Sequence, residues 1–148
     1  MWFEGSIVES KVLSNRLRAE IGDLGKSFTD TFTGDGTTKR FQLPYAPVNG
    51  ISLRVAVNGV DVSSITSVEE VNGLFEIQSI PANNAVISVS GVAYKYFTDT
   101  EIQYYISQAF YEHAHTSTDS NGSLNTLATM PFVEEYPLVI LATSMALY

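Results

Sequence analysis

The chain has 148 residues, 45% of them hydrophobic, so it is long enough for one domain, or a domain with a subdomain, around a real core. It contains no cysteine, which excludes disulfides, thiolate catalysis and zinc–thiolate sites. The formal net charge is -8, from 16 acidic and 8 basic residues, and a tight nucleic-acid reader is not expected because phosphate binding needs clustered cations.

Residues 8–24 have the pattern of an amphipathic helix. Apolar residues recur at helical spacing and are expected to face the core, while Lys11, Arg16, Arg18 and Glu20 occupy other faces. Glycines near residue 22 predict that the helix ends there. The apolar positions are Leu13, Leu17, Ile21 and Leu24.

Residues 28–97 are expected to form a mainly antiparallel β module, either a sandwich or a partly open barrel, because short alternating runs are separated by turn residues. Asn58-Gly59 is the strongest turn signal, since both positions of such a hairpin need positive φ, and Asn72-Gly73 repeats it. Gly34-Asp35-Gly36 indicates another turn, and Gly91 is a candidate bulge. The expected strands cover residues 30–33, 39–43, 53–57, 60–62, 74–77 and 85–96.

The pattern becomes helical after residue 97. Thr98 and Glu101 fit a capping box, and apolar residues then recur at helical spacing to about residue 114. Residues 116–130 read as a long polar loop, and Pro137 suits the first turn of a last helix. Residues expected to face the interior with the first helix are Ile102, Ile106, Ala109 and Phe110.

These elements predict an α+β fold in three parts. An N-terminal arm and helix occupy residues 1–27, the β module residues 28–97, and a C-terminal helical part residues 98–148. The two ends form a small helical frame into which the β module is inserted. No apolar run reaches the ~20 residues of a membrane span, and the N-terminus lacks the basic and apolar regions of a signal peptide, so no membrane partner is expected.

Residues suited to catalysis or metal binding are few. His113 and His115 are two apart, whereas a helical zinc pair needs histidines four apart. The adjacent carboxylates Glu69 and Glu70 point apart along a strand, so they do not form an acid–base pair. The glycines around Asp35 open a strand rather than a helix, so no helix N-terminus is available there for phosphate. We expect a non-enzymatic protein that holds no cofactor and no metal.

A series of segments spans most of the chain. The first helix ends in LRAEIGD (17–23), then come FTGDGTT (32–38) and FQLPYAPV (41–48), VAVNGV (55–60) and GLFEI (73–77), and FTDTEI (97–102) leads into a helix. This order resembles the head–tail connector (adaptor) proteins of tailed bacteriophages, in which a small helical frame carries a β insertion. The Gly-Asp-Gly-Thr and Asn-Gly-Val pieces also recur in β modules of other phage tail and baseplate proteins.

The resemblance implies a virion structural protein at the head–tail junction, assembled in the host cytoplasm. It would form a homo-oligomeric ring, expected to be a dodecamer, that contacts portal protein and tail or neck proteins and extends the DNA channel without reading DNA sequence. Glu134 and Glu135 would line that channel or meet a basic neighbour. Residues 1–7 and 116–132 are expected to order by packing on neighbouring subunits or on portal protein, through Trp2, Phe3, Leu124, Leu127, Met130 and Phe132.

Two alternatives stay open. The first is another phage tail, baseplate or decoration protein. The second belongs to a different class, a carbohydrate-binding or glycan-degrading β module in which Trp2 and tyrosines stack on sugars. The sequence shows no recognisable carboxylate pair for the latter. The chain also carries a dense group of aromatic residues, of which Tyr94 and Tyr96 are expected to lie on one face of a strand. The others are expected to fill the junction between β module and helix, or a subunit interface: Phe97, Tyr104, Tyr105, Phe110 and Tyr111.

Overall fold

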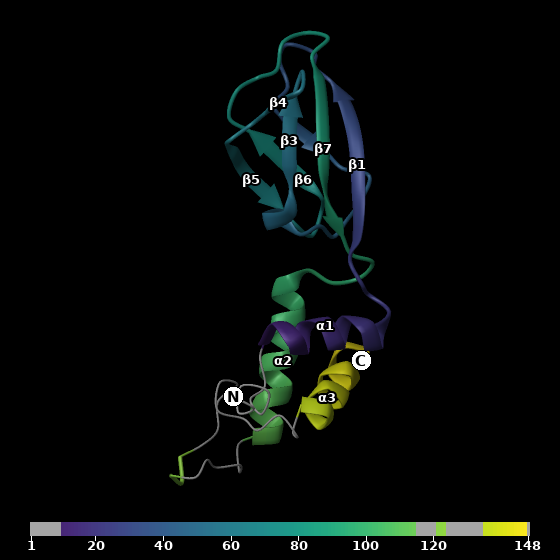
Figure 1. The fold of residues 1–148 in the computed structure, drawn as a ribbon, viewed down its shortest axis with the longest axis vertical. Helices are drawn as coiled ribbons and strands as arrows, with labels where there is room; N and C mark the ends of the chain where they lie inside the picture. Colours follow the sequence, from purple (N-terminus) through teal and green to yellow (C-terminus); the bar gives the residue numbers. More distant parts are fainter. Residues whose placement is uncertain (1–9, 115–120, 124–134, 148) are drawn as a thin grey trace, which may run out of the picture. The chain divides into compact units, whose positions relative to one another are not determined.

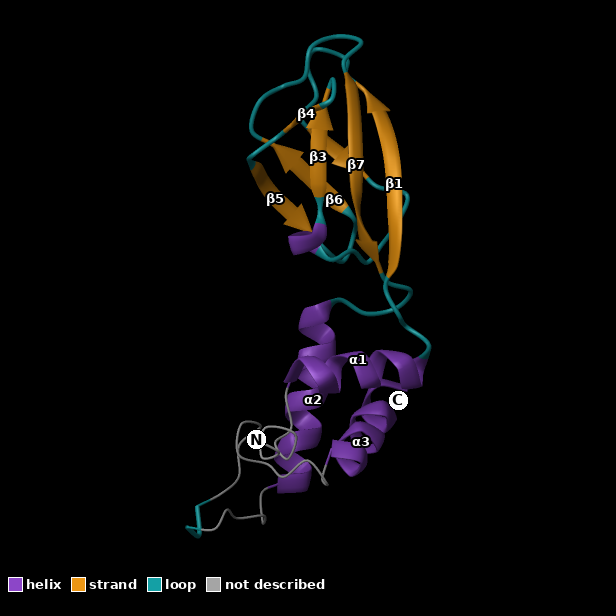
Figure 2. Ribbon diagram, in the orientation of Figure 1, coloured by secondary structure: helices purple, strands orange, loops and turns teal. Residues whose placement is uncertain are grey.

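The chain is divided into two units and passes between them at two places in the sequence. The computed structural model describes residues 10–114, 121–123 and 135–147. The helical unit consists of the described parts of Met1–Leu24 and Asp99–Tyr148, and the β unit is Gly25–Thr98. Figure 1 gives the order of the elements and Figure 2 their type. The predicted α+β class, with a β module inserted between helices, is confirmed.

Three helices form the helical unit: α1 (Ser10–Ile21), α2 (Asp99–Ala114) and α3 (Glu135–Leu147). Each packs against the other two. The apolar spacing read from the sequence explains the packing, because the predicted positions form the buried faces of α1 and α2. The buried residues of this unit are Leu13, Leu17, Ile21, Ile102, Ile106, Ala109, Val139 and Ala142.

Three expectations for these helices need correction. Leu24 is exposed, because α1 ends at Ile21 and Gly22 adopts a φ of 72°, which turns the chain out of the helix. Phe110 is half-buried rather than interior, so it lies at the margin of the core. Arg18 is buried, although the helical spacing places it off the apolar face.

The β unit is built from two antiparallel sheets, with no closed barrel. The four-stranded sheet has the order β1-β7-β3-β4 and the three-stranded sheet the order β2-β6-β5. Their bounds are β1 (Lys26–Thr33), β2 (Arg40–Gln42), β3 (Arg54–Val57), β4 (Val60–Asp61), β5 (Ile65–Glu69), β6 (Leu74–Ile77) and β7 (Val86–Ala93). A short 3-10 helix, η2 (Gly50–Ser52), precedes β3.

Apolar side chains from both sheets meet in one core, which makes the β unit a sandwich rather than a partly open barrel. Phe41 and Phe75 stack with ring centroids 5.5 Å apart, and Phe32 packs against both rings. Alternation places every second residue of each strand in this layer. The buried members are Phe28, Phe41, Leu43, Val48, Leu53, Val55, Phe75, Ile77, Ile87 and Val89.

The turn signals are confirmed at two sites and wrong in detail at a third. Asn58 and Gly59 have φ of 51° and 80°, as the predicted two-residue hairpin requires. At Asp35, the carboxylate accepts hydrogen bonds from the backbone N–H groups of Thr37 and Thr38, which fixes the predicted turn. At Asn72-Gly73 the turn is longer, because Glu69 pairs with Leu74 and four residues separate them.

Gly91 does not form the expected bulge. It lies in an unbroken register, opposite Phe28 of β1. A Cβ at this position would lie 2.8 Å from Cδ2 of Leu53, so the glycine is needed for close packing against the core. The register shift of the β unit lies instead in β5, between Ile65 and Ser67.

Candidate functional site

Most of the interface residues predicted from the sequence lie outside the described residues. These are Trp2, Phe3, Leu124, Leu127, Met130, Phe132 and Glu134. Glu135 is the first residue of α3, and its side chain is also outside the description. The packing of these side chains on neighbours, and the role of the two glutamates in a channel, therefore stay predictions. The same holds for the histidines, since the side chain of His113 and the whole of His115 are not described.

The outer face of α2 carries two exposed aromatic side chains. Tyr104 is 59% exposed and Tyr111 is 70% exposed, although the opposite face of the same helix is buried. The two are seven residues apart, so they lie on one side of the helix, two turns from each other. Large aromatic side chains that stay in water on a rigid helix are typical of protein–protein contact sites. This outer face is the described surface of the helical unit best suited to bind a partner.

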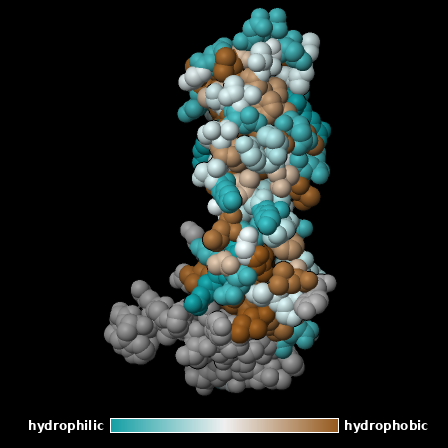
Figure 3. Space-filling model, turned by 90° about the vertical axis from the view of Figure 1, so that its right-hand side faces the viewer, coloured by the Kyte–Doolittle hydropathy of each residue, from teal (hydrophilic) through white to brown (hydrophobic). Residues whose placement is uncertain are grey.

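Surface polarity differs between the two units on the visible face in Figure 3. Hydrophilic and hydrophobic residues are interspersed over the β unit, whereas hydrophobic residues gather in larger areas over the described surface of the helical unit. In α3, the apolar side chains of Ile140 and Leu147 are exposed as well. Hydrophobic surface of this kind favours association with other protein surfaces.

A buried ion cluster, the Arg18 clamp (Arg18, Asp23 and Asp99), lies within the helical unit where the chain leaves it and returns. Nη1 of Arg18 donates to Oδ2 of Asp23 at 2.8 Å, and Nη2 donates to Oδ1 of Asp99 at 2.8 Å. The Arg18 and Asp23 side chains are 5% and 0% exposed, whereas the Asp99 side chain is 46% exposed. The clamp ties the C-terminal end of α1 to the first residue of α2. A buried cation needs such partners, which explains why Arg18 departs from the expected solvent face.

The Arg18 clamp was not found by sequence reasoning. Asp99 lies 81 residues from Arg18, and a charged residue on an amphipathic helix is normally read as solvent-facing. The single local signal is Asp23, whose backbone N–H also donates to the carbonyl of Arg18 at 2.8 Å. That contact belongs to the helix end and by itself points to no ion pair.

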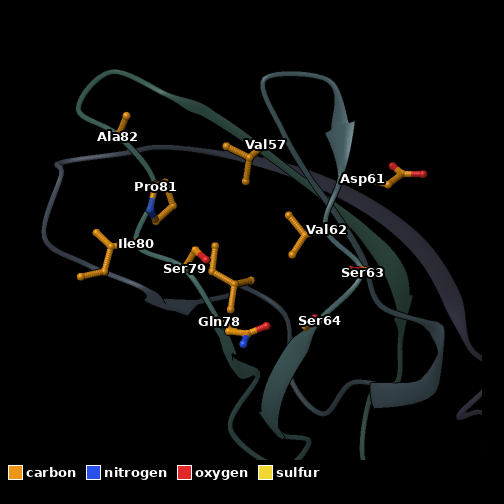
Figure 4. A pocket seen from close by; sticks show the side chains of 11 residues that line it. Val57, Asp61, Val62, Ser63, Ser64, Gln78, Ser79, Ile80, Pro81 and Ala82 are labelled. Carbon is orange, nitrogen blue, oxygen red and sulfur yellow. The ribbon is translucent and has the colours of Figure 1, made fainter.

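The β unit has a surface pocket of about 390 Å³ between the end of β3 and the segment that follows β6. Figure 4 shows Val57 and Val62 facing the segment of Ile80 and Pro81, with the carboxylate of Asp61 directed away from them. Of the described residues that line the pocket, only Asp61 is ionisable. Because acid–base chemistry needs two positioned titratable groups, this lining offers binding contacts but no such pair.

The Asp35 turn holds a carboxyl group whose pKa departs clearly from its ordinary value. The hydroxyl of Thr38 donates to the Asp35 carboxylate at 2.6 Å, and with the two backbone N–H donors it lowers the pKa of Asp35. All three donors stabilise the charged form, and the side chain is exposed. The lowered pKa is thus a consequence of turn geometry and leaves Asp35 ionised rather than poised for proton transfer.

Neither metal binding nor membrane insertion has support in the described ranges. Among these residues, no group of three or more His, Cys, Asp or Glu side chains is placed to hold a metal ion. In the same part of the chain, no helix combines the length and the apolar character needed to cross a bilayer. Comparison with known proteins adds nothing to the sequence resemblance, since no protein-family model and no curated protein matches the chain.

Proposed function

We propose that the protein is a non-enzymatic structural component of a tailed-phage virion, the connector between the portal of the head and the tail. The observation that carries the proposal is the architecture: helices from both ends of the chain form one unit, and a β-sandwich is inserted between them as a single continuous segment. This is the arrangement that the resemblance to connector proteins implies.

The outer face of α2 supports a role in assembly. Tyr104 and Tyr111 remain in water on a helix whose other face is buried, and a partner subunit or the portal protein would cover them. In the proposed ring, this face contacts a neighbour, and the predicted arms with Trp2 and Phe132 add to the same contacts. Assembly then buries side chains that the single chain leaves exposed.

The charge distribution supports a passage for DNA rather than a DNA-binding site. All eight Lys and Arg residues precede Phe97, and six carboxylates follow it. Carboxylates along a channel repel phosphates, so DNA passes without adhering, and salt screens this repulsion over about 8–10 Å. Reversing Glu134 and Glu135 to lysine should slow DNA ejection if they line the channel, or prevent the joining of head and tail if they face a neighbour.

The carbohydrate-binding alternative receives little support from the β unit. Sugar sites usually present aromatic rings inside a pocket or groove. Three described hollows of the β unit have volumes of about 390, 340 and 430 Å³, and none of the described residues lining these three is aromatic. Another tail, baseplate or decoration component stays the nearer alternative, because it shares the β motifs.

The proposal is tested in virions and with purified proteins. Immunogold labelling of particles that contain the chain should place it at the head–tail junction, and the purified chain should co-purify with portal protein. A Tyr104→Ser, Tyr111→Ser double variant should lose that co-purification, whereas Tyr45→Ser, on an exposed tyrosine of the β unit, serves as the matched control. Labelling at the baseplate or capsid surface would favour the nearer alternative, and absence from virions would refute the proposal.

A further inference from the structure

The outer edge of the four-stranded sheet carries an unexpected charge. β1 is eight residues long and, among the strands that the structure describes, pairs only with β7, so its other side is an open edge of the described sheet. Phe28 and Phe32 face the core, and strand alternation puts Asp30 in the same row between them. An apolar residue is expected at such a position. A carboxylate there needs a separate explanation.

The register shows which backbone groups face away from β7. The N–H of Gly34 donates to the carbonyl of Ala85, directly beyond the last β1–β7 pair, so Gly34 belongs to a hydrogen-bonded pair. Hydrogen-bonded pairs alternate along antiparallel strands, and therefore Phe32, Asp30 and Phe28 bond to β7. The residues between them direct their backbone N–H and C=O groups to the open edge: Ser27, Thr29, Thr31 and Thr33.

Asp30 occupies the middle of that open row. Its Oδ1 accepts a hydrogen bond from the backbone N–H of Thr31 at 2.9 Å. The donor is one of the groups that an added strand would need. The carboxylate of Asp30 thus occupies the N–H group of Thr31, and it places a negative charge where another strand would lie.

The opposite edge of the same sheet is closed in a related way. β4 covers only the later part of β3, and Val62 makes the last contact through its N–H to the carbonyl of Val55. Beyond this point the carbonyl of Leu53 faces the uncovered edge, and Nη1 of Arg54 donates to it at 2.8 Å and to the carbonyl of Ile51 at 3.0 Å. A charged side chain therefore satisfies the backbone at both edges.

We propose that Asp30 keeps the β1 edge closed to a second copy of this chain. The β1 edges of two copies are complementary to each other. When the two strands lie antiparallel about a two-fold axis, the free N–H groups of each edge can donate to the free carbonyl groups of the other. Without the carboxylate, the open row of threonines would pair with its copy and join two four-stranded sheets into one. The inference does not depend on the proposed function. If subunits form a ring, they meet through surfaces other than this edge.

The test uses the full-length chain with Asp30→Val, and with Asp30→Thr as a second, more polar variant. Both variants remove the carboxylate. In light scattering, both are expected to lower the protein concentration at which half of the chains are associated by roughly tenfold or more. Hydrogen exchange should become slower at the amides of Thr29 and Thr33 in the associated state. Thr29→Val, which adds an apolar β-branched residue to the same strand but leaves the carboxylate in place, is the matched control and should behave as the wild type.

Each result bears on the proposal. Association of either Asp30 variant together with protected β1 amides supports it, provided that circular dichroism shows a folded chain. Wild-type behaviour of the folded variants overturns it. Equal association of Thr29→Val would assign the effect to added hydrophobicity, and association without protection of β1 would assign it to another surface. Both of these outcomes also overturn the proposal.

Discussion

Replacing Arg18 by methionine is expected to destabilise the helical unit strongly, because it removes the cation of the Arg18 clamp while the carboxylate of Asp23 stays buried. Methionine keeps much of the length and the helix propensity of arginine, so the loss of charge dominates. The Asp23 side chain is fully buried and forms its ion pair with Arg18 at 2.8 Å.

The magnitude follows from the burial of each partner. Removing one member of a buried ion pair costs about 3–5 kcal/mol, because the buried charge that remains loses its ion pair. Asp99 is 46% exposed, so its own contribution is that of a surface pair, about 0–1 kcal/mol. Arg40 and Glu69 form an ion pair in the β unit with both side chains about half exposed, and Arg40→Met is therefore expected to cost no more than about 1 kcal/mol.

Urea unfolding followed by far-ultraviolet circular dichroism measures these differences in the free energy of unfolding, since that signal reports on both the helices and the strands. Arg18→Met should lower the midpoint far more than Asp99→Asn or Arg40→Met does. Adding Asp23→Leu to Arg18→Met should recover much of the loss, because an apolar pair can replace a buried ion pair. A cost for Arg18→Met no larger than that for Arg40→Met would refute the reasoning.

Two further predictions concern a turn and the outer face of α2. Gly59→Ala should cost about 1–2 kcal/mol in urea unfolding, because a φ of 80° disfavours any side chain but the space is open. Gly73→Ala should cost clearly more, since its Cβ would also lie 2.2 Å from the carbonyl oxygen of Tyr45, and equal costs would contradict this. Tyr104→Ser and Tyr111→Ser should leave stability within about 0.5 kcal/mol of the wild type but weaken co-purification with portal protein, corresponding to a binding loss of at least roughly 1 kcal/mol. Unchanged co-purification would remove these tyrosines from the interface.

Local signals allowed much of the fold to be predicted. The helix predicted over residues 99–114 is confirmed as α2, Asp99–Ala114. It is predictable because its capping residues and its apolar spacing both lie within the helix segment itself. The Asn58-Gly59 hairpin is equally local. Strand limits were less predictable. β1 begins at Lys26 rather than at Asp30, because pairing with Ala93 of β7 extends it, and pairing partners far apart in sequence leave no local signal.

The candidate sites were predictable only in part. The helical spacing places Tyr104 and Tyr111 off the apolar stripe of α2, but the sequence alone does not distinguish a tyrosine in solvent from one that contacts a neighbour. The Arg18 clamp depends on a partner 81 residues away, so burial of the cation became evident only from the fold. The sequence predicts that Asp30 lies in a strand and indicates no other role for it. The proposed role of the Asp30 carboxylate depends on β1 being an edge strand, and the order of strands in the sheet determines this.

The insertion of the β unit between α1 and α2 imposes an order of events during translation. All seven strands lie between residues 26 and 93, so the sandwich can form as soon as β7 leaves the ribosome. The α1 side chains Leu13 and Leu17 cannot be buried at that stage, because the helices against which α1 packs begin at residues 99 and 135. Although α1 is synthesised before every strand of the β unit, it is therefore among the last of the described elements to fold. Until then its apolar face is available to chaperones, and this interval is when the nascent chain is most exposed to aggregation.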